Sequence, residues 1–297
     1  MATVALDTTR SQAPSAWTIR WRRLRRFPWL PVVLLAPVVI CGVFGGWIFP
    51  HDPTAIDLMS PRKVPAWLDG GDWSYVLGTD QFGRDLLSRL MEGARVALEV
   101  ALASVVLSSL IGVSAGMVAG YYGGVADNIL MRVADTIFAI PAILLIILIG
   151  GAVGGGFLTV LVSIVIVSWV LYARVIRGET LVLRERGFVA LARVANCSDF
   201  RILFRHILPN VMPTCIVLMT LQAGFALLIE AAITFIGLGI QPPATTWGLL
   251  VAEGRPYIAT AWWIPTFAGT AITVTVLGAN LMGDWLQDRF NPRLRQI

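Results

Sequence analysis

The segment "GFVALARVANCSDFRILFRHILPN" spans residues 187–210 and is basic and amphipathic, although it lies between two of the most apolar stretches of the chain. From residue 177 onward its apolar residues recur at three- and four-residue spacings, which is typical of amphipathic helices. Asn196 tolerates the left-handed conformation that ends many helices. Ser198 can cap the helix that follows, with Asp199 in its first turn. The segment therefore predicts two short helices joined by a tight turn.

The apolar residues of each predicted helix form a stripe along one face. For the first helix, residues 177–195, they are Ile176, Leu183, Phe188, Leu191, Val194 and Ala195. For the second helix they are Ile202, Leu203 and Ile207, after which Pro209 and Pro213 precede or open the next apolar stretch. Two interpretations stay open from these residues alone. The hairpin either packs on lipid headgroups or docks a cytoplasmic protein partner.

The stretches on either side of the hairpin belong to a set that is long and apolar enough to cross a bilayer. A spanning helix needs about 20 mostly apolar residues. The stretches that meet this are residues 29–49, 95–119, 129–150, 156–176, 212–238 and 262–284. Of the 297 residues, 57% are hydrophobic and only 14% are charged, whereas soluble domains are about 25% charged. The sequence therefore predicts an all-α membrane protein with six spans.

The first apolar stretch follows the basic run from Arg20 to Arg26, which is a feature of signal peptides. It is longer than the usual apolar region of about 7–15 residues, and it lacks a small-x-small cleavage site. We therefore expect a permanent helix.

The arginines indicate how the spans are oriented. They gather before the first span, between the fourth and fifth, and after the sixth, and cytoplasmic flanks are the ones enriched in arginine and lysine. Both termini and the hairpin are therefore predicted to be cytoplasmic. Topology accounts for the net charge of +5, so no nucleic-acid partner is implied. We expect Trp262 and Trp263 to anchor the sixth span in an aromatic belt.

This topology divides the chain into predicted regions. They are a cytoplasmic tail (1–28), the first span (29–49), an external segment (50–94), a core with the other five spans (95–284) that includes a cytoplasmic loop (177–211), and a cytoplasmic tail (285–297).

Ionisable residues inside spans are costly and point to function by default. Arg132 and Asp135 are three residues apart and can pair on one helix face; a structural bridge and a direct role toward substrate or protons both stay open. Glu99 is expected near the outer end of its helix, in a structural role. Glu230 lies deeper, where a helix–helix hydrogen bond and a pathway role are both open. No series of spaced carboxylates indicates a proton-driven pump.

Two backbone features shape the predicted spans. Pro141 should kink the third span because it cannot donate the backbone bond one turn back. Gly112, Gly116 and Gly120 form a repeated small-xxx-small row, which predicts a close helix contact with a neighbour in this chain or in another.

Several chemistries lack their motifs in this sequence. The single lysine, Lys63, has no P-loop context, and neither H-E-x-x-H nor G-x-S-x-G occurs. The three cysteines form no C-x-x-C pair, and the two histidines are far apart, so neither a zinc site nor a disulfide framework is indicated. We expect no catalytic residue, no metal site and no cofactor bound by this chain.

The sequence resembles ABC importer permeases of the dipeptide/oligopeptide/nickel family, in particular their C-type subunit. Residues 187–210 are similar to the cytoplasmic EAA loop of these permeases. Further similar blocks are "HDPTAIDL", "LGTDQFGRDLLSRLMEGARVAL", "GGVADNILMRVADTIFAIP", "IEAAITFIGLGIQPPATTWG" and "GDWLQDRFNPRLR". The resemblance extends over about residues 25–297, in several separate blocks.

The resemblance implies a type I permease fold with six spans in a bacterial cell membrane, forming half of a translocation pore for short peptides. It implies a B-type permease partner, two ATPase subunits or domains that bind ATP and Mg²⁺, and an external substrate-binding protein. The EAA loop would occupy a cleft of the ATPase. The positions implied for ATPase coupling are Phe188, Ala190, Leu191, Ala192, Arg193, Asn196, Ser198, Asp199, Arg201, Arg205 and Pro209.

The loop departs from the family pattern at three positions. Ala190 replaces the family's glutamate, Leu191 its first alanine and Asn196 its glycine, whereas Ala192 keeps the second alanine. Asn196 can still make the turn, because asparagine tolerates positive φ. We expect docking to persist through shape and through Arg193, Arg201 and Arg205.

Other functions stay open beside peptide import. The same family also offers import of nickel or another small solute, and a self-contained channel or secondary transporter is the alternative from a different class. A catalytic membrane protein has the least support because its motifs are missing.

Overall fold

The structure is a computed structural model, and it describes residues 28–290. Its regular elements are α2 (Trp29–Ile48), α3 (Leu86–Tyr122), α4 (Gly124–Ala139), α5 (Ala142–Val153), α6 (Phe157–Arg184), α7 (Gly187–Val194), α8 (Asp199–Arg201), η1 (Ile202–Ile207), α9 (Leu208–Phe235), α10 (Trp247–Gly254), η2 (Arg255–Tyr257) and α11 (Trp263–Phe290). Most of the predicted tails, residues 1–27 and 291–297, lies outside the described residues.

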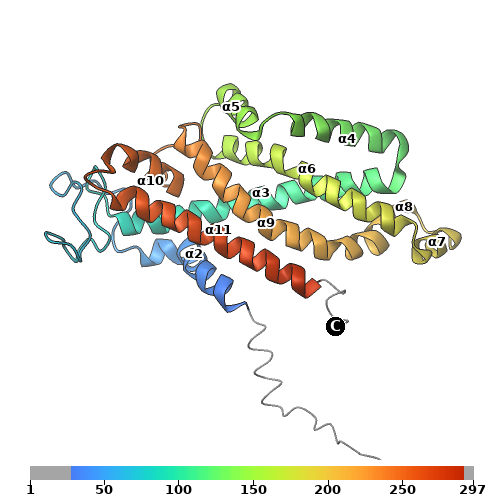
Figure 1. Ribbon diagram of the computed structural model, residues 1–297, viewed down its shortest axis with the longest axis horizontal. Coiled ribbons are helices and arrows are strands. Elements are labelled where there is room, and N and C mark those ends of the chain that lie inside the picture. Colours follow the sequence, from blue (N-terminus) through green and yellow to red (C-terminus); the bar gives the residue numbers. More distant parts are fainter. Residues whose placement is uncertain (1–27, 291–297) are drawn as a thin grey trace, which may run out of the picture.

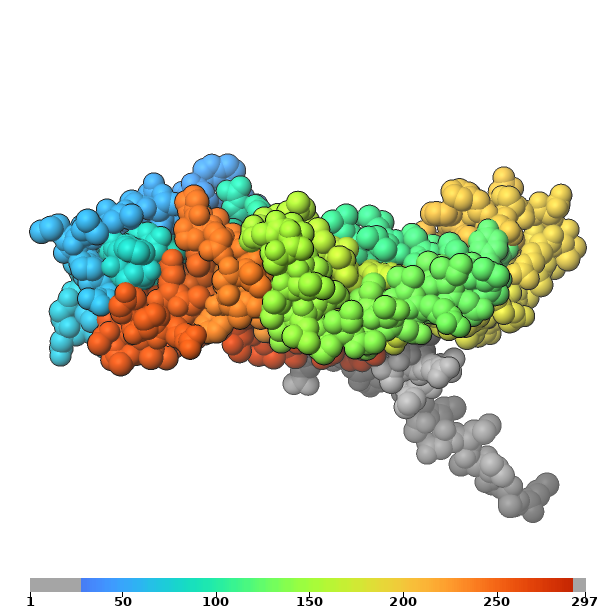
Figure 2. Space-filling model, turned by 90° about the horizontal axis from the view of Figure 1, so that it is seen from above, coloured from blue at the N-terminus to red at the C-terminus, as the bar shows by residue number. Residues whose placement is uncertain are grey.

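The long helices run side by side in an elongated bundle (Figure 1). The loop from residue 49 to residue 85 and α10 lie at one end, here called the loop end. The helices α7, α8 and η1 form the helical hairpin at the opposite end, here called the hairpin end. Figure 2 shows this hairpin, in yellow, projecting from the body of the molecule.

Five helical segments in the described part of the chain are long and apolar enough to cross a membrane: α2, α3, α6, α11 and the continuous run Asp199–Phe235. A sixth span exists only if α4 and α5 are counted together, because they meet at 91°. The predicted span over residues 129–150 is therefore broken, not merely kinked. The residue before a proline is driven out of the helical region, and Ile140 is accordingly extended at φ −91°, ψ 127°.

Several helices extend beyond the predicted spans. α3 begins at Leu86 instead of residue 95, because the carboxylate of Asp85 accepts the backbone N–H of Ser88 at 2.9 Å and so caps the helix. α6 continues to Arg184 and α11 to Phe290. Polar ends of this kind lie outside any hydropathy-based prediction.

The glycine row of α3 packs against α6 of the same chain, which answers the question that the sequence leaves open. A Cβ atom on Gly116 would lie 2.6 Å from the carbonyl oxygen of Ala173, and one on Gly112 would lie 2.4 Å from that of Trp169. A Cβ on Gly120 would lie 2.7 Å from Cβ of Thr180. The absence of side chains lets the two backbones touch, as expected for small-xxx-small rows.

We expect Gly116→Ala to destabilise the protein. The added methyl group would force α3 and α6 apart, and overpacking of this kind costs about 1–3 kcal/mol. Gly178→Ala is the matched control, because nothing lies within 4 Å of a Cβ at this helical position of α6. Thermal unfolding of the detergent-solubilised protein should show a lower midpoint for the first variant alone. Equal midpoints would contradict the tight contact.

Candidate functional site

The hairpin consists of the surface helix α7, a turn, the short helix α8 and the π-helical segment η1, which leads into α9. The predicted helix over residues 177–195 is divided, because Arg186 is extended at φ −76°, ψ 144° and separates α6 from α7. Asn196 has φ +56°, so it makes the left-handed turn that the sequence predicts. The hydroxyl of Ser198 accepts the backbone N–H of Arg201 at 3.4 Å, in the predicted capping position.

The helix α7 is apolar on two faces. Val189 and Ala192 face inward and pack with Ile202, Leu203 and Ile207, the second predicted stripe. The first predicted stripe faces outward, since Leu191 is 71% exposed and Val194 is 86% exposed. Apolar spacing predicts a helix, but it could not decide which apolar face of α7 packs inward.

Further apolar side chains lie exposed next to α7. Phe200 is 70% exposed, and its ring centre lies 4.3 Å from that of the exposed Phe204. Ala190 is exposed as well. We call Phe188, Leu191, Val194, Phe200 and Phe204 the apolar tip of the hairpin.

Polar contacts hold the hairpin to the end of α3. The hydroxyl of Tyr121 donates to Asp199 at 2.7 Å, and the guanidinium of Arg193 lies 5.3 Å from the centre of the Tyr121 ring. Arg184 donates to the carbonyl oxygen of Gly120 at 3.0 Å. Arg193 and Asp199 therefore position the hairpin, whereas the side chains of Arg201 and Arg205 are exposed. Pro209 is the second residue of α9, directly after η1.

The charges of α4 pair with α6 and not with each other. Asp135 accepts from Arg174 at 2.6 Å, so the predicted partner of Asp135, Arg132, is wrong. Asp127 accepts two hydrogen bonds from Arg177, at 2.5 and 2.6 Å. Residues three apart share a face, but Arg174 of the antiparallel neighbour α6 lies within hydrogen-bond distance of Asp135. Arg132 and Asp135 both line an open cavity of about 590 Å³ between these helices.

The two acidic residues predicted inside spans differ in their surroundings. Glu99 is exposed and accepts from Arg95 at 3.1 Å within α3. Glu230 is only 2% exposed, and it accepts from the hydroxyl of Thr234 at 2.9 Å on the same helix. This bond lies within α9, so both interpretations of Glu230 stay open.

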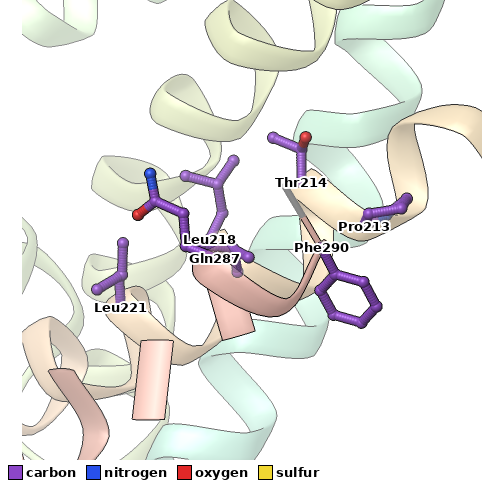
Figure 3. A pocket seen from close by; sticks show the side chains of 7 residues that line it. Pro213, Thr214, Leu218, Leu221, Gln287 and Phe290 are labelled. Atoms are coloured by element: carbon purple, nitrogen blue, oxygen red, sulfur yellow. The ribbon is translucent and has the colours of Figure 1, made fainter. Parts of the chain in front are cut away.

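A second cavity, of about 380 Å³, lies between α9 and α11 toward the hairpin end (Figure 3). Its lining is mostly apolar, with Leu218 and Phe290, and includes Gln287 and Thr214. The hydroxyl of Thr214 donates to Glu179 of α6 at 2.5 Å. Sequence reasoning did not single out Glu179, because a lone glutamate near a predicted span end carries no pattern.

A buried ionic cluster, which no sequence motif indicates, connects the loop end to α3 and α10. Asp80 is fully buried and accepts from Arg84 at 2.6 Å and from Arg89. Glu253 of α10 accepts from Arg89 at 2.8 Å and from Arg84 at 3.1 Å. Arg89 is 1% exposed. The available signal was the pair of arginines beside an aspartate, but only folding brings Glu253 to them.

Trp263 also belongs to this loop end. Its indole N–H donates to the carbonyl oxygen of Thr79 at 3.2 Å, and its side chain is 3% exposed. The prediction that Trp263 anchors the helix in lipid is therefore wrong, because the loop between α2 and α3 covers the ring. Trp262 is 42% exposed, and its place in an aromatic belt stays a prediction.

The same loop is shaped by aspartates that accept hydrogen bonds from residues two positions later. The backbone N–H of Ser74, at 2.9 Å, followed by its hydroxyl and by Lys63, lowers the pKa of Asp72. The hydroxyl of Thr54, at 2.6 Å, is the main cause that lowers the pKa of Asp52. Hydrogen bonds to the charged form favour it, so both turns persist at neutral pH.

Comparisons with known proteins agree with this architecture. Residues 112–296 match the family described as binding-protein-dependent transport system inner membrane component. A di/tripeptide transport system permease protein, DppC of Pseudomonas aeruginosa, is 40% identical over 87% of this chain and 85% of its own length. The glutathione transport system permease protein GsiD of Pectobacterium atrosepticum is 39% identical over 94% of this chain and 92% of its own length.

A solved structure shares the fold. A chain of the MetNI methionine ABC transporter in an inward-facing conformation matches with a TM-score of 0.53 at 18% identity, over 67% of this chain and 93% of that chain. The helices and these matches define a multi-pass membrane permease of a transport system, and not an enzyme. The chain belongs to the family of binding-protein-dependent transport system inner membrane components.

We expect Glu253→Gln to loosen the loop end. The change leaves Arg84 and Arg89 with one carboxylate for two buried charges, and breaking a buried ion pair costs about 3–5 kcal/mol. Glu99→Gln is the control, because exposed pairs contribute about 0–1 kcal/mol. Limited proteolysis should cut the loop between α2 and α3 faster in Glu253→Gln, together with a lower unfolding midpoint. The cluster would have no structural role if both variants behaved like the parent protein.

Proposed function

We propose that this chain forms half of the translocation pore of an ATP-driven importer for short peptides. The observation that carries the proposal is the apolar tip, a group of large apolar side chains on a projecting hairpin whose sequence is similar to the EAA loop. Exposed apolar groups of this kind mark sites of interaction. The names of the relatives, which include di/tripeptide and glutathione transport permeases, support the cargo class.

The proposal sets the orientation of the chain in a bacterial inner membrane. The hairpin end and both termini are cytoplasmic, since the arginines gather there. The loop end is external and receives a substrate-binding protein. A second, B-type permease completes the pore, and two ATPase subunits or domains, which bind ATP and Mg²⁺, dock on the hairpins from below.

Coupling follows from the way the hairpin is attached. ATP binding can reorient the spans only if the ATPase has different contact energy with the two permease states. A movement of the hairpin is transmitted to α6, because α7 follows α6 after a break of only two residues. It is also transmitted to α9, because η1 continues into α9 without a break. The Tyr121–Asp199 hydrogen bond passes it to α3 as well. The hairpin therefore acts as a lever that is fixed to three long helices.

Because the loop departs from the family pattern, we infer that its docking on the ATPase depends mainly on apolar side chains. Ala190 offers no carboxylate to the ATPase, and Arg193 is engaged with Tyr121. Leu191, where the family has alanine, is instead the most accessible large side chain of the middle of α7. We infer that an apolar cleft of the ATPase receives Leu191, Phe200 and Phe204, with Arg201 and Arg205 at its margin.

Two alternatives remain beside peptide import. Nickel or another small solute would use the same partners, since selection rests largely with the external binding protein. A self-contained channel or secondary transporter would need no ATPase, and the apolar tip then has no partner. The cavity between α9 and α11 and the buried Glu230 are candidate pathway elements under each alternative.

We expect Leu191→Asp to abolish stable association with the ATPase. A carboxylate in the middle of the apolar tip must lose water on docking, which should weaken binding at least ~10-fold, or about 1.4 kcal/mol. Gly187→Asp is the control, because it adds the same charge at the exposed start of α7, where the helix dipole favours it. The measurement is co-purification of the ATPase with the tagged permease, with the partner permease as internal reference.

Three results would be informative. Loss of the ATPase alone from Leu191→Asp supports the proposal. Full retention of the ATPase by that variant would overturn the docking role of the apolar tip. If no ATPase and no second permease accompany the parent protein, the importer proposal itself is wrong.

A further inference from the structure

The helix α2 is only loosely covered by the rest of the chain. Pro31 and Gly45 are its only buried residues, and Leu30, Val33 and Val43 are among its exposed ones. It contacts α11 where Gly278 faces Leu34 and Leu35, and α3 where Gly42 faces Leu98. Between these contacts, toward the loop end, the packing leaves a groove.

This groove lies between α2, α3 and α11 and measures about 350 Å³. Its lining includes Val33 and Cys41 of α2, Met91 of α3, and Phe267 and Ala271 of α11, while Leu77 and Trp247 contribute from the loop and from α10. None of the lining side chains is charged. The hydroxyl of Thr270, which also lines the groove, donates within its own helix to Thr266 at 2.8 Å.

An aromatic cluster adjoins the groove through Phe267. Phe267, one of its lining residues, lies 6.0 Å from Trp67 and 6.1 Å from Trp262, measured between ring centres. Trp67 is 52% exposed and Trp262 is 42% exposed. Tryptophans gather at the level of the lipid headgroups, where one end of the ring is wet and the other apolar. In the proposed topology the cluster would lie at the bilayer surface, and the groove would extend from it into the hydrocarbon region.

We propose that this groove binds one acyl chain of a phospholipid from the leaflet at the loop end, which is the outer leaflet in the proposed topology. The open side of the groove is continuous with the exposed apolar faces of α2 and α11, both of which are candidate spans. A peptide is a poor occupant, because its charged termini would lie unpaired among apolar side chains.

A helix of a partner protein could cover the groove only from its open side, and it is the alternative that the labelling experiment distinguishes. A flexible hydrocarbon chain adapts to such a space and fills the contacts that a void would forfeit. The lipid would thereby complete the packing of α2 on the core.

Photolabelling tests this site in the full-length permease, within its complex, in nanodiscs of phosphatidylethanolamine and phosphatidylglycerol. The probe is a phosphatidylethanolamine that carries a diazirine on one acyl chain, and adducts are mapped by peptide mass spectrometry. Adducts should concentrate on groove residues such as Val33, Cys41 and Ala271, several-fold above other exposed apolar positions of the same helices.

The variants are chosen to fill the groove from either wall. Ala271→Trp and Val33→Trp should each reduce groove labelling to the level of other lipid-facing residues. Leu277→Trp, on a 49% exposed position of α11 outside the groove lining, should leave it unchanged. Even labelling along α2 and α11 would mean that only ordinary surrounding lipid is present. Absence of lipid adducts from the groove residues within the complex would assign the groove to a partner helix.

Discussion

The contact between the glycine row of α3 and the backbone of α6 is the constraint on which the rest of the molecule depends. Lipid tails are as apolar as leucine, so helices in a bilayer gain little from burying apolar surface against each other and rely on close packing. Gly112, Gly116 and Gly120 bring the two backbones together along several turns. Because α7 follows α6 after a two-residue break, and the end of α3 binds Asp199, this contact also determines where the hairpin projects.

Ion pairs lie at both ends of the helical bundle, and they differ in how deeply they are buried. At the loop end, Asp80, Arg84, Arg89 and Glu253 form a buried cluster that holds the loop against α10. Toward the hairpin end, arginines of α6 reach the aspartates of α4 across a more open cavity. The hairpin combines both kinds of surface, since polar contacts attach it to α3 and apolar side chains face outward. That division is what a docking element requires.

Much of this could be predicted from sequence, because several features depend on local chemistry. Apolar length predicts the spans, Asn196 and Ser198 predict the turn of the hairpin, and the glycine row predicts a close contact. The partners of charged side chains could not be predicted in the same way. Asp135 pairs with Arg174, and Glu253 pairs with Arg84 and Arg89. These residues are far apart in the sequence, and only the tertiary fold brings them together. Spacing does not predict which face of α7 packs inward either, since both of its faces are apolar and tertiary packing decides between them.

The central claim is that the hairpin couples this permease to ATP hydrolysis. The most direct test is uptake of a labelled dipeptide by proteoliposomes that contain the permease pair, the ATPase and the binding protein. The account predicts uptake that requires ATP and the binding protein, persists without an ion gradient, and is competed by di- and tripeptides. Uptake by the permease alone, driven by a proton or sodium gradient and indifferent to ATP, would contradict it.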